Sequence, residues 1–264
     1  MEDYTGSVVI ITGACGGIGA TISSHFARAG TALGLCDIRA SDLEQLAGAL
    51  AEQGAKVHHS PVDVTDQDAV RGFCQATAQA LGGINHLINT VGVVDNAGDV
   101  IELSLEVWDR TLAVNLTSAF LMAKGAVPHI ISSGGGSIVN ISSISGLANQ
   151  ARAMAYSVTK AGLLALTRSQ AIDLAQHNIR ANAICPGSVE TPLVEQAIAL
   201  TADETGRTPE ETRKDWQSQY PTGRFSDPRD VAELALFLCS PRAANITGAS
   251  LGVDGGLMAL LPER

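Results

Sequence analysis

Short runs of β-branched residues alternate along the chain with longer segments of helical period. The apolar runs lie at residues 7–12, 32–37, 56–64, 86–89, 136–142, 179–186 and 249–254. Such alternation is typical of a parallel sheet, because a parallel connection needs a crossover long enough to hold a helix. The sequence therefore predicts an α/β fold with a doubly wound, seven-stranded parallel sheet and helices on both faces.

The chain shows no sign of a division into domains. Its 264 residues contain no Pro-rich, Ser-rich or charge-run linker, and 45% of them are hydrophobic, enough for a sizeable core. We therefore expect a single domain over residues 1–264. The alternation is interrupted at about residues 188–226, where no strand is expected. A long excursion after a strand typically forms a binding loop or lid, so this segment is expected to border the substrate.

Several helix starts are marked by capping patterns. Thr208 with Glu211 has the spacing of a capping box inside the excursion, and Ser41 with Glu44 has the same spacing after the second expected strand. Asp227 precedes a proline, a good pair for the N-cap and the first helical position. These signals agree with the helices that the hydrophobic pattern predicts.

The charge balance limits the classes of partner. Seventeen basic and twenty-seven acidic residues give a net charge of −10, which argues against nucleic-acid and anionic-membrane surfaces. The chain contains no unbroken run of about 18 apolar residues, the length that a membrane-spanning helix needs. The acidic segment 1–7 precedes the first apolar run and lacks the features of a signal peptide. We expect a cytoplasmic protein.

Cysteine and histidine give no sign of a disulfide framework or a metal site. The five cysteines are scattered without a CxxC spacing, and an odd number cannot all pair within one chain. The adjacent His58 and His59 would point to opposite sides of a strand, which is poor geometry for a shared metal. We expect reduced thiols and no metal.

A glycine-rich turn follows the first expected strand and opens a helix. Gly13, Gly17 and Gly19 in TGACGGIG have the spacing G-x-x-x-G-x-G. Glycines allow the backbone to approach a pyrophosphate, and a helix N-terminus offers unpaired N–H groups and a positive dipole end. The alternative is a tight turn without a ligand. The strand-turn-helix context favours a Rossmann-like dinucleotide site.

Two acidic residues close the next strands. Asp37 lies about twenty residues beyond the glycines, where a carboxylate can accept hydrogen bonds from an adenosine ribose and repel a 2′-phosphate. This favours NAD over NADP, although Arg39 could approach such a phosphate. Asp63 stands where it could hold an adenine amino group, but a simple turn carboxylate is equally compatible with its position.

Tyr156 and Lys160 in AYSVTKAG are four residues apart on an expected helix, so their side chains share one face. Most such pairs are surface contacts without a function. This pair becomes informative only together with other motifs.

Several motifs do accompany it: TGACGGIG at 12–19, DV at 63–64, Asn115 in AVNLTSAF, Ser143 in NISSISG, CPGSVETP at 185–192 and VDGG at 253–256. With these motifs, residues 7–256 resemble the classical short-chain dehydrogenases/reductases. One motif departs from the family pattern: NTVG at 89–92 stands where NNAG is common. We expect a local change in how that turn is braced, with cofactor binding retained.

The resemblance implies hydride transfer between NAD and a secondary alcohol or ketone. It implies that Tyr156 is the acid/base, and that Lys160 lowers the Tyr156 pKa, which is ordinarily near 10. Ser143 would orient the substrate oxygen, and Asn115 would hold a water in a proton path. The residues that it implies for cofactor binding are Gly13, Gly17, Ile18, Gly19, Asp37, Asp63, Val64, Asn89, Gly92, Tyr156, Lys160, Pro186, Gly187, Val189 and Thr191.

Evidence on the substrate is thinner. Asn149, Gln150 and Ser188 are polar residues in segments expected to line the pocket, which favours a small or medium hydroxylated molecule. Arg152 could bind a carboxylate, but a surface or subunit-interface position fits it better. Family resemblance also implies a homotetramer packed through helices at about 104–132 and 153–177.

Three alternative functions remain open at this point. One is a non-catalytic protein that senses NAD on the same scaffold, since fold does not determine function. Another is an NADP-dependent carbonyl reductase. Epimerase or dehydratase chemistry is disfavoured by the glycine spacing and by the lack of a large C-terminal substrate domain.

Overall fold

All seven predicted strands are present in one parallel sheet. The computed structural model describes residues 4–94 and 98–260. The strand order is β3-β2-β1-β4-β5-β6-β7, and each neighbouring pair is parallel. The strands are β1 (Val8–Thr12), β2 (Ala32–Asp37), β3 (Val57–Pro61), β4 (His86–Asn89), β5 (Gly136–Ile141), β6 (Ile179–Pro186) and β7 (Ser250–Val253). This confirms the predicted single-domain, doubly wound Rossmann-like fold.

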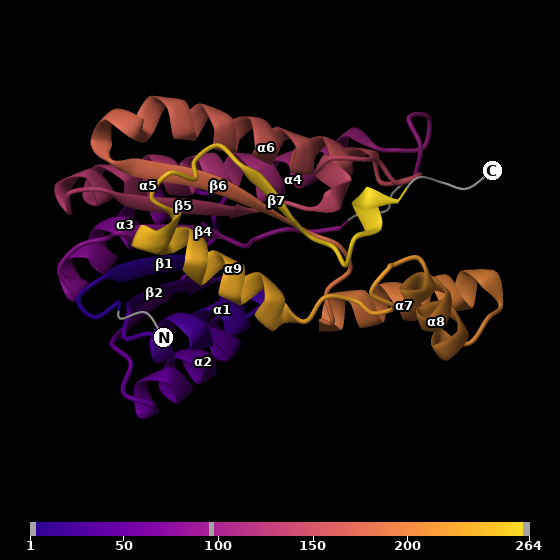
Figure 1. Cartoon of the computed structure of the whole chain (residues 1–264), viewed down its shortest axis with the longest axis horizontal. Coiled ribbons are helices and arrows are strands. Elements are labelled where there is room, and N and C mark those ends of the chain that lie inside the picture. The colour runs from indigo at the N-terminus through magenta and orange to yellow at the C-terminus, as the bar shows by residue number, and fades with distance from the viewer. Residues whose placement is uncertain (1–3, 95–97, 261–264) are drawn as a thin grey trace.

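Helices cover both faces of this sheet (Figure 1). Helix α1 packs against α9 and α2 in one layer, while α3 packs against α5, and α6 against α4, in the other. The described helices are α1 (Gly17–Arg28), α2 (Ala40–Glu52), α3 (Gln67–Leu81), α4 (Leu105–Leu112), α5 (Ser118–Ser132), α6 (Met154–Leu174), α7 (Pro192–Thr205), α8 (Pro209–Ser218) and α9 (Pro228–Cys239). Burial on both faces explains why β1 is apolar at nearly every position rather than alternating.

The topology brings separate parts of the sequence to one edge. Because every strand runs in the same direction, the segments that follow β1 to β6 leave the sheet at its carboxyl edge. Strands β2 and β3 lie on one side of β1, and β4 to β7 lie on the other, so the order in which strands are added reverses at β1. Ligands of doubly wound folds bind outside the carboxyl ends at this switch point.

The excursion forms two helices, α7 and α8, that project beyond the sheet (Figure 1). They are attached through an apolar cluster of Ile198, Tyr220 and Phe225, with Trp216 packed against it. The predicted capping box of Thr208 and Glu211 is present at the start of α8. Asp227 likewise caps α9, as predicted. The excursion is therefore an ordered part of the domain.

Some local boundaries differ from the sequence prediction. Strand β3 ends at Pro61, so Asp63 lies beyond the strand rather than at its end. Helix α2 begins at Ala40 without a side-chain cap, and the expected cap Ser41 lies inside the helix. Glu44 contacts His59 on the neighbouring β3 at 2.9 Å instead of completing a capping box. A contact between two elements has replaced the predicted local one.

His86 forms a buried polar contact at the amino end of β4. Its Nδ1 lies 2.8 Å from the Ser137 hydroxyl on β5, and its ring meets that of Tyr4 edge-on. Burial lowers the pKa of His86 to about 4, and the Arg180 charge adds to the shift. The folded protein therefore keeps this imidazole neutral where an unfolded chain would protonate it.

We expect this histidine to make the fold sensitive to acid. Because its folded pKa is depressed, its contribution is complete above the unfolded pKa near 6.5 and is lost as pH falls toward about 4. The predicted loss is about 3 kcal/mol in the free energy of unfolding between pH 7 and pH 4. Urea unfolding of the wild type, His86→Asn and the control His177→Asn measures it. A wild type and His86→Asn with the same pH dependence would contradict the prediction.

Candidate active site

The glycine-rich turn connects β1 to α1, and its shape favours glycine at Gly13, Gly17 and Gly19; a Cβ at Gly19 would lie 2.2 Å from the Gly13 carbonyl oxygen. Gly13 has a φ of 59°, in the left-handed region. A Cβ at Gly17 would lie 2.6 Å from the Thr191 methyl group, so the chain after β6 closes directly over this turn. Helix α1 has no side-chain cap at Gly16. Its first N–H groups therefore suit a pyrophosphate, and the turn fits a dinucleotide cofactor.

Asp37 ends β2 beside this turn. Its Oδ2 accepts a hydrogen bond from the Cys15 backbone N–H at 3.0 Å, and its Oδ1 accepts from Arg39 N and Nε at 3.0 and 3.3 Å. Burial alone would raise the pKa of Asp37, but the hydrogen bonds from Arg39 and Cys15 outweigh it and lower that pKa. Asp37 is therefore an oriented carboxylate, and its Oδ2 keeps a lone pair for a ribose hydroxyl group.

Arg39, the residue that leaves NADP open, is held by two carboxylates. It pairs with Asp37, and its Nη1 lies 3.1 Å from Asp42 Oδ2. Asp63, in contrast, is exposed and accepts from the backbone and hydroxyl groups of Thr65 at 2.9 and 2.6 Å. Asp63 thus stabilises a turn, as the alternative interpretation of its position proposed, and an adenine contact remains a prediction. The adjacent Val64 is buried.

The segment after β4 crosses the middle of the same edge. The Asn89 amide donates to Asn140 on β5 at 2.8 Å, while its Oδ1 is buried without a hydrogen-bond partner among the described residues. A buried acceptor without a partner is costly, which suits a site completed by a ligand. A Cβ at Gly92 would lie 3.2 Å from Lys160 Nζ, so this backbone passes directly beside the lysine.

The predicted Ser143, Tyr156 and Lys160 are together at the end of β5. Ser143 follows the strand and forms a hydrogen bond with the Tyr156 side chain. Lys160 is buried; its Nζ donates to the Ile141 carbonyl at 3.0 Å and lies 5.5 Å from the Tyr156 ring centroid. Ser142 donates to the Lys160 carbonyl at 2.8 Å. Ser142 therefore supports the backbone of α6, and Ser143 meets the phenol.

Protonation in this cluster is governed by burial. Burial raises the pKa of Tyr156, and the hydrogen bond from Ser143 opposes that shift only in part. Burial lowers the pKa of Lys160 to about 8, which leaves the ammonium largely charged at neutral pH. The chain by itself therefore does not show the lowered Tyr156 pKa that the sequence predicts, because desolvation of the phenolate outweighs the hydrogen bond from Ser143.

Asn115 occupies an unusual place in the helix layer. It lies in a π-helical segment, Ala113–Thr117, between α4 and α5. Its amide accepts from the Val93 N–H at 2.7 Å and donates to the Val93 carbonyl at 2.9 Å, and its Nδ2 also reaches the Thr159 hydroxyl at 3.2 Å. Asn115 thus fastens the loop after β4 to α6. The water-holding role that the resemblance implies remains a prediction.

The segment after β6 closes the site on its other side. The Gly187 N–H donates to the Val253 carbonyl at 3.0 Å. Val189 is buried and forms an isolated parallel β-bridge with Ser226, shortly before α9 begins. The Thr191 hydroxyl donates to the Val189 carbonyl at 3.1 Å. Pro186 pairs with Val253 at the end of β6. Of the remaining predicted cofactor residues, Ile18 packs against the core and Gly19 is buried in α1.

The three predicted substrate residues are divided between two loops. Asn149 and Gln150 are exposed in the loop before α6, whereas Ser188 is half-buried and donates its N–H to the Tyr220 hydroxyl at 2.7 Å. Arg152 is exposed and paired with Glu102 at 2.8 Å. This ion pair agrees with the surface position expected for Arg152. A substrate contact is unproven for all three predicted residues.

Two contacts of the excursion escaped the sequence analysis. Tyr220 binds the Ser188 backbone, and Arg213 pairs with Glu190 at 2.9 Å and with Glu195. No short motif marks Tyr220 or Arg213, because their partners depend on how α7 and α8 fold back. These contacts fix the excursion beside the segment that contains Thr191.

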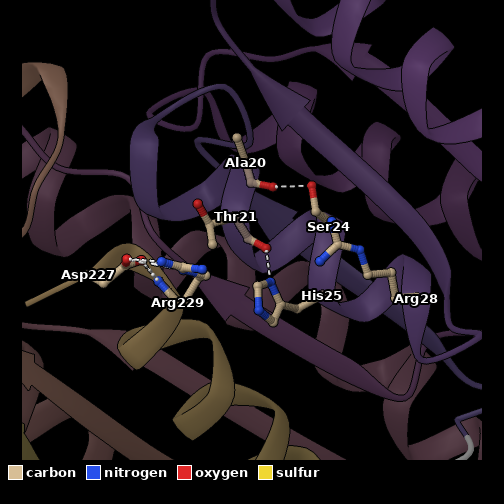
Figure 2. A pocket seen from close by; sticks show the side chains of 7 residues that line it. All are labelled: Ala20, Thr21, Ser24, His25, Arg28, Asp227 and Arg229. Carbon is tan, nitrogen blue, oxygen red and sulfur yellow. Dashed lines mark hydrogen bonds and ion pairs between the residues drawn. The ribbon is translucent and has the colours of Figure 1, made fainter. Parts of the chain in front are cut away.

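A pocket of about 370 Å³ lies elsewhere, between α1 and α9. Figure 2 shows its lining residues Ala20, Thr21, Ser24, His25, Arg28, Asp227 and Arg229, with Arg229 paired to Asp227. None of them is a predicted site residue. Among residues 4–94 and 98–260, no three His, Cys, Asp or Glu side chains are grouped to hold a metal, and no described helix is long and apolar enough to cross a membrane.

The chain is similar to known dehydrogenases over nearly its whole length. It is 36% identical to the cis-4-hydroxycyclohexanecarboxylate dehydrogenase of Sinomonas cyclohexanicum, covering 98% of this chain and 99% of that protein. It is also 36% identical to the D-beta-hydroxybutyrate dehydrogenase of Rhizobium meliloti, covering 95% and 98%.

Solved structures agree with these sequence similarities. The carveol dehydrogenase of Mycobacterium avium in complex with NAD has a TM-score of 0.94 at 27% identity, covering 98% of this chain and 100% of that chain. The aldohexose dehydrogenase of Thermoplasma acidophilum has a TM-score of 0.88 at 34% identity, covering 100% and 97%. A family model described as Enoyl-(Acyl carrier protein) reductase matches residues 13–258. The chain therefore belongs to the short-chain dehydrogenase/reductase family.

Proposed function

We propose that this protein is an NAD-dependent oxidoreductase that interconverts a secondary alcohol and a ketone on a small or medium hydroxylated substrate. The observation that carries the proposal is the buried Lys160 beside Tyr156, with Ser143 hydrogen-bonded to the same phenol. The family's nicotinamide chemistry suits such a cluster. Relatives named for cis-4-hydroxycyclohexanecarboxylate, D-beta-hydroxybutyrate and aldohexose support a hydroxylated substrate.

The chain's own residues would manage the proton and the geometry. A nicotinamide cofactor, when bound, supplies the hydride acceptor or donor and, in its oxidised form, a positive charge. Tyr156 takes the alcohol proton in oxidation and returns it in reduction. Ser143 orients the substrate oxygen, and the Lys160 ammonium group places a positive charge near the phenol. Asn115 keeps the loop after β4 in place beside Lys160.

The half-buried Tyr156 phenol needs more positive charge than Lys160 provides. In the chain alone, burial keeps the pKa of Tyr156 above its ordinary value. A second cation about 4 to 5 Å away contributes about 3 to 4 kcal/mol at an effective dielectric near 20, equivalent to two to three pKa units. We therefore propose that Tyr156 becomes a competent base only with oxidised cofactor present.

The choice of NAD follows from Asp37. Its lowered pKa keeps a negative charge at the end of β2, beside the glycine turn. Such a carboxylate suits a ribose diol and repels a 2′-phosphate. Arg39, a cation beside it, is already shared by Asp37 and Asp42. NADP-dependent carbonyl reduction remains the second candidate because Arg39 is close.

We also propose a homotetramer and a cytoplasmic location, without nucleic-acid or membrane partners. Large apolar side chains are exposed within the helices expected at subunit contacts; Phe120 on α5 is 49% exposed and Ile172 on α6 is 77% exposed. Exposed apolar side chains on neighbouring helices are typical of a surface covered by a partner.

Tyr156→Phe should reduce turnover at least a thousandfold, because the ring stays and the proton-transferring hydroxyl is lost. The assay is a panel of secondary alcohols, polyols and hydroxy acids with NAD or NADP, following the absorbance of reduced cofactor. Tyr4→Phe, the same change in the distant core, should retain activity. Near-normal turnover of Tyr156→Phe would overturn the assignment. If the wild type binds NAD but turns over no substrate of the panel, the NAD-sensing alternative is favoured.

Asp37→Ser should shift the preference toward NADP. The change removes a negative charge and releases one partner of Arg39, so we expect the ratio of kcat/KM for NADP to that for NAD to rise on the order of ten- to a hundredfold. Asp42→Ser is the matched control, since it releases Arg39 equally but leaves Asp37 in place. A wild type that works faster with NADP, or an Asp37→Ser ratio equal to that of Asp42→Ser, would contradict this reading.

Light scattering should give a mass four times that of one chain. Ile172→Asp places a charge in the proposed apolar contact and should shift the distribution toward smaller species. A wild type that remains monomeric at micromolar concentration would contradict the proposed homotetramer.

A further inference from the structure

The contact between β1 and β4 continues past the end of their backbone ladder. The last paired residues are Ile11 and Ile88. Beyond them, the Thr90 N–H donates to the Thr12 hydroxyl at 3.1 Å, and the Thr90 hydroxyl donates back to the Thr12 carbonyl. Side chains thus hold the two strands together at the point where the glycine-rich turn begins.

The same hydroxyl reaches the first residue of the turn. Thr90 Oγ1 lies 3.4 Å from the Gly13 carbonyl oxygen. A Cβ at Gly13 would lie 3.1 Å from both Thr90 Oγ1 and the Val91 side chain, so the two residues fit closely against this glycine. The Gly13 carbonyl also accepts the Gly16 N–H at 3.0 Å, which closes the turn before α1. Thr90 therefore contacts the pivot of the turn.

The other end of this short segment is fixed as well. Both backbone groups of Val93 are bonded to Asn115, and Gly92 passes beside Lys160. A segment held at both ends has little freedom to absorb a change at one of them. Residues 90–93 therefore connect the glycine turn to the buried lysine as one braced strip.

We propose that Thr90 is a positioning residue for cofactor binding. Its hydroxyl donates to the Thr12 carbonyl and lies beside the Gly13 carbonyl, and so keeps the turn in the shape that presents the first N–H groups of α1 to a pyrophosphate. The proposal rests on the proposed cofactor function. Because β-branched threonine has restricted χ1 freedom, its hydroxyl is already oriented toward these carbonyls.

The test measures the Kd for NADH by fluorescence titration in three variants. Thr90→Val keeps the shape and removes the donor, and should raise the Kd about tenfold, the effect expected of one lost hydrogen bond in a half-buried place. Thr90→Ser keeps the donor and should stay within about threefold of wild type. Thr77→Val is the matched control, since Thr77 is buried and its hydroxyl has no partner among the described residues.

A merely structural role for Thr90 would lower the melting temperature and leave the Kd for NADH unchanged. That result, or a Thr90→Ser variant as weak as Thr90→Val, would overturn the inference. With a turned-over substrate, the KM for NAD should rise while kcat at saturating NAD stays within about threefold. If Thr90→Val does not fold, Thr90→Ala is compared with Thr77→Ala by the same titration and the same criteria. A wild type that binds neither NADH nor NADPH would instead refute the proposed function.

Discussion

The parallel sheet ends its strands at one edge, and the whole site depends on that constraint. Six segments that are far apart in sequence leave the sheet there, and each carries a predicted residue within a few positions of its strand end. Because helices cover both faces of the sheet, a ligand reaches the strands at their ends and not on the faces. The predicted site residues are thus brought together by the common direction of the strands and by the burial of both sheet faces.

Burial at this edge sets the protonation states as strongly as charge does. Lys160 is buried, its Nζ donates a hydrogen bond to the Ile141 backbone carbonyl, and burial lowers its pKa to about 8. Tyr156 is shifted in the opposite direction by the same effect. A neutral phenol beside a weakened cation is a resting state. In the proposed function, this state would link the base strength of Tyr156 to the charge of the cofactor, so that no proton is removed before a hydride acceptor is bound.

Much of this was predictable from the sequence because it depends on local pattern. The strand periods, the glycine turn, Asp37 and the Tyr156–Lys160 spacing are each fixed by a few neighbouring residues, and their places in the structure follow. The prediction of Ser41 as a cap was wrong because α2 begins at Ala40, one residue before it, and Glu44 contacts His59 on β3. The contacts of Tyr220 and Arg213 were missed because they require the folded excursion. The departure at Thr90 was visible in the sequence, but its contact with Gly13 depends on the approach of β4 to β1.

We propose that the charge of the bound oxidised cofactor acidifies the half-buried Tyr156 phenol. The chain has only three tyrosines, so the ultraviolet absorbance of tyrosinate can be followed against pH with and without NAD. We predict that one tyrosine titrates at least two pH units lower when NAD is bound, and that Tyr156→Phe lacks this component. Identical titration curves with and without saturating NAD would contradict the account.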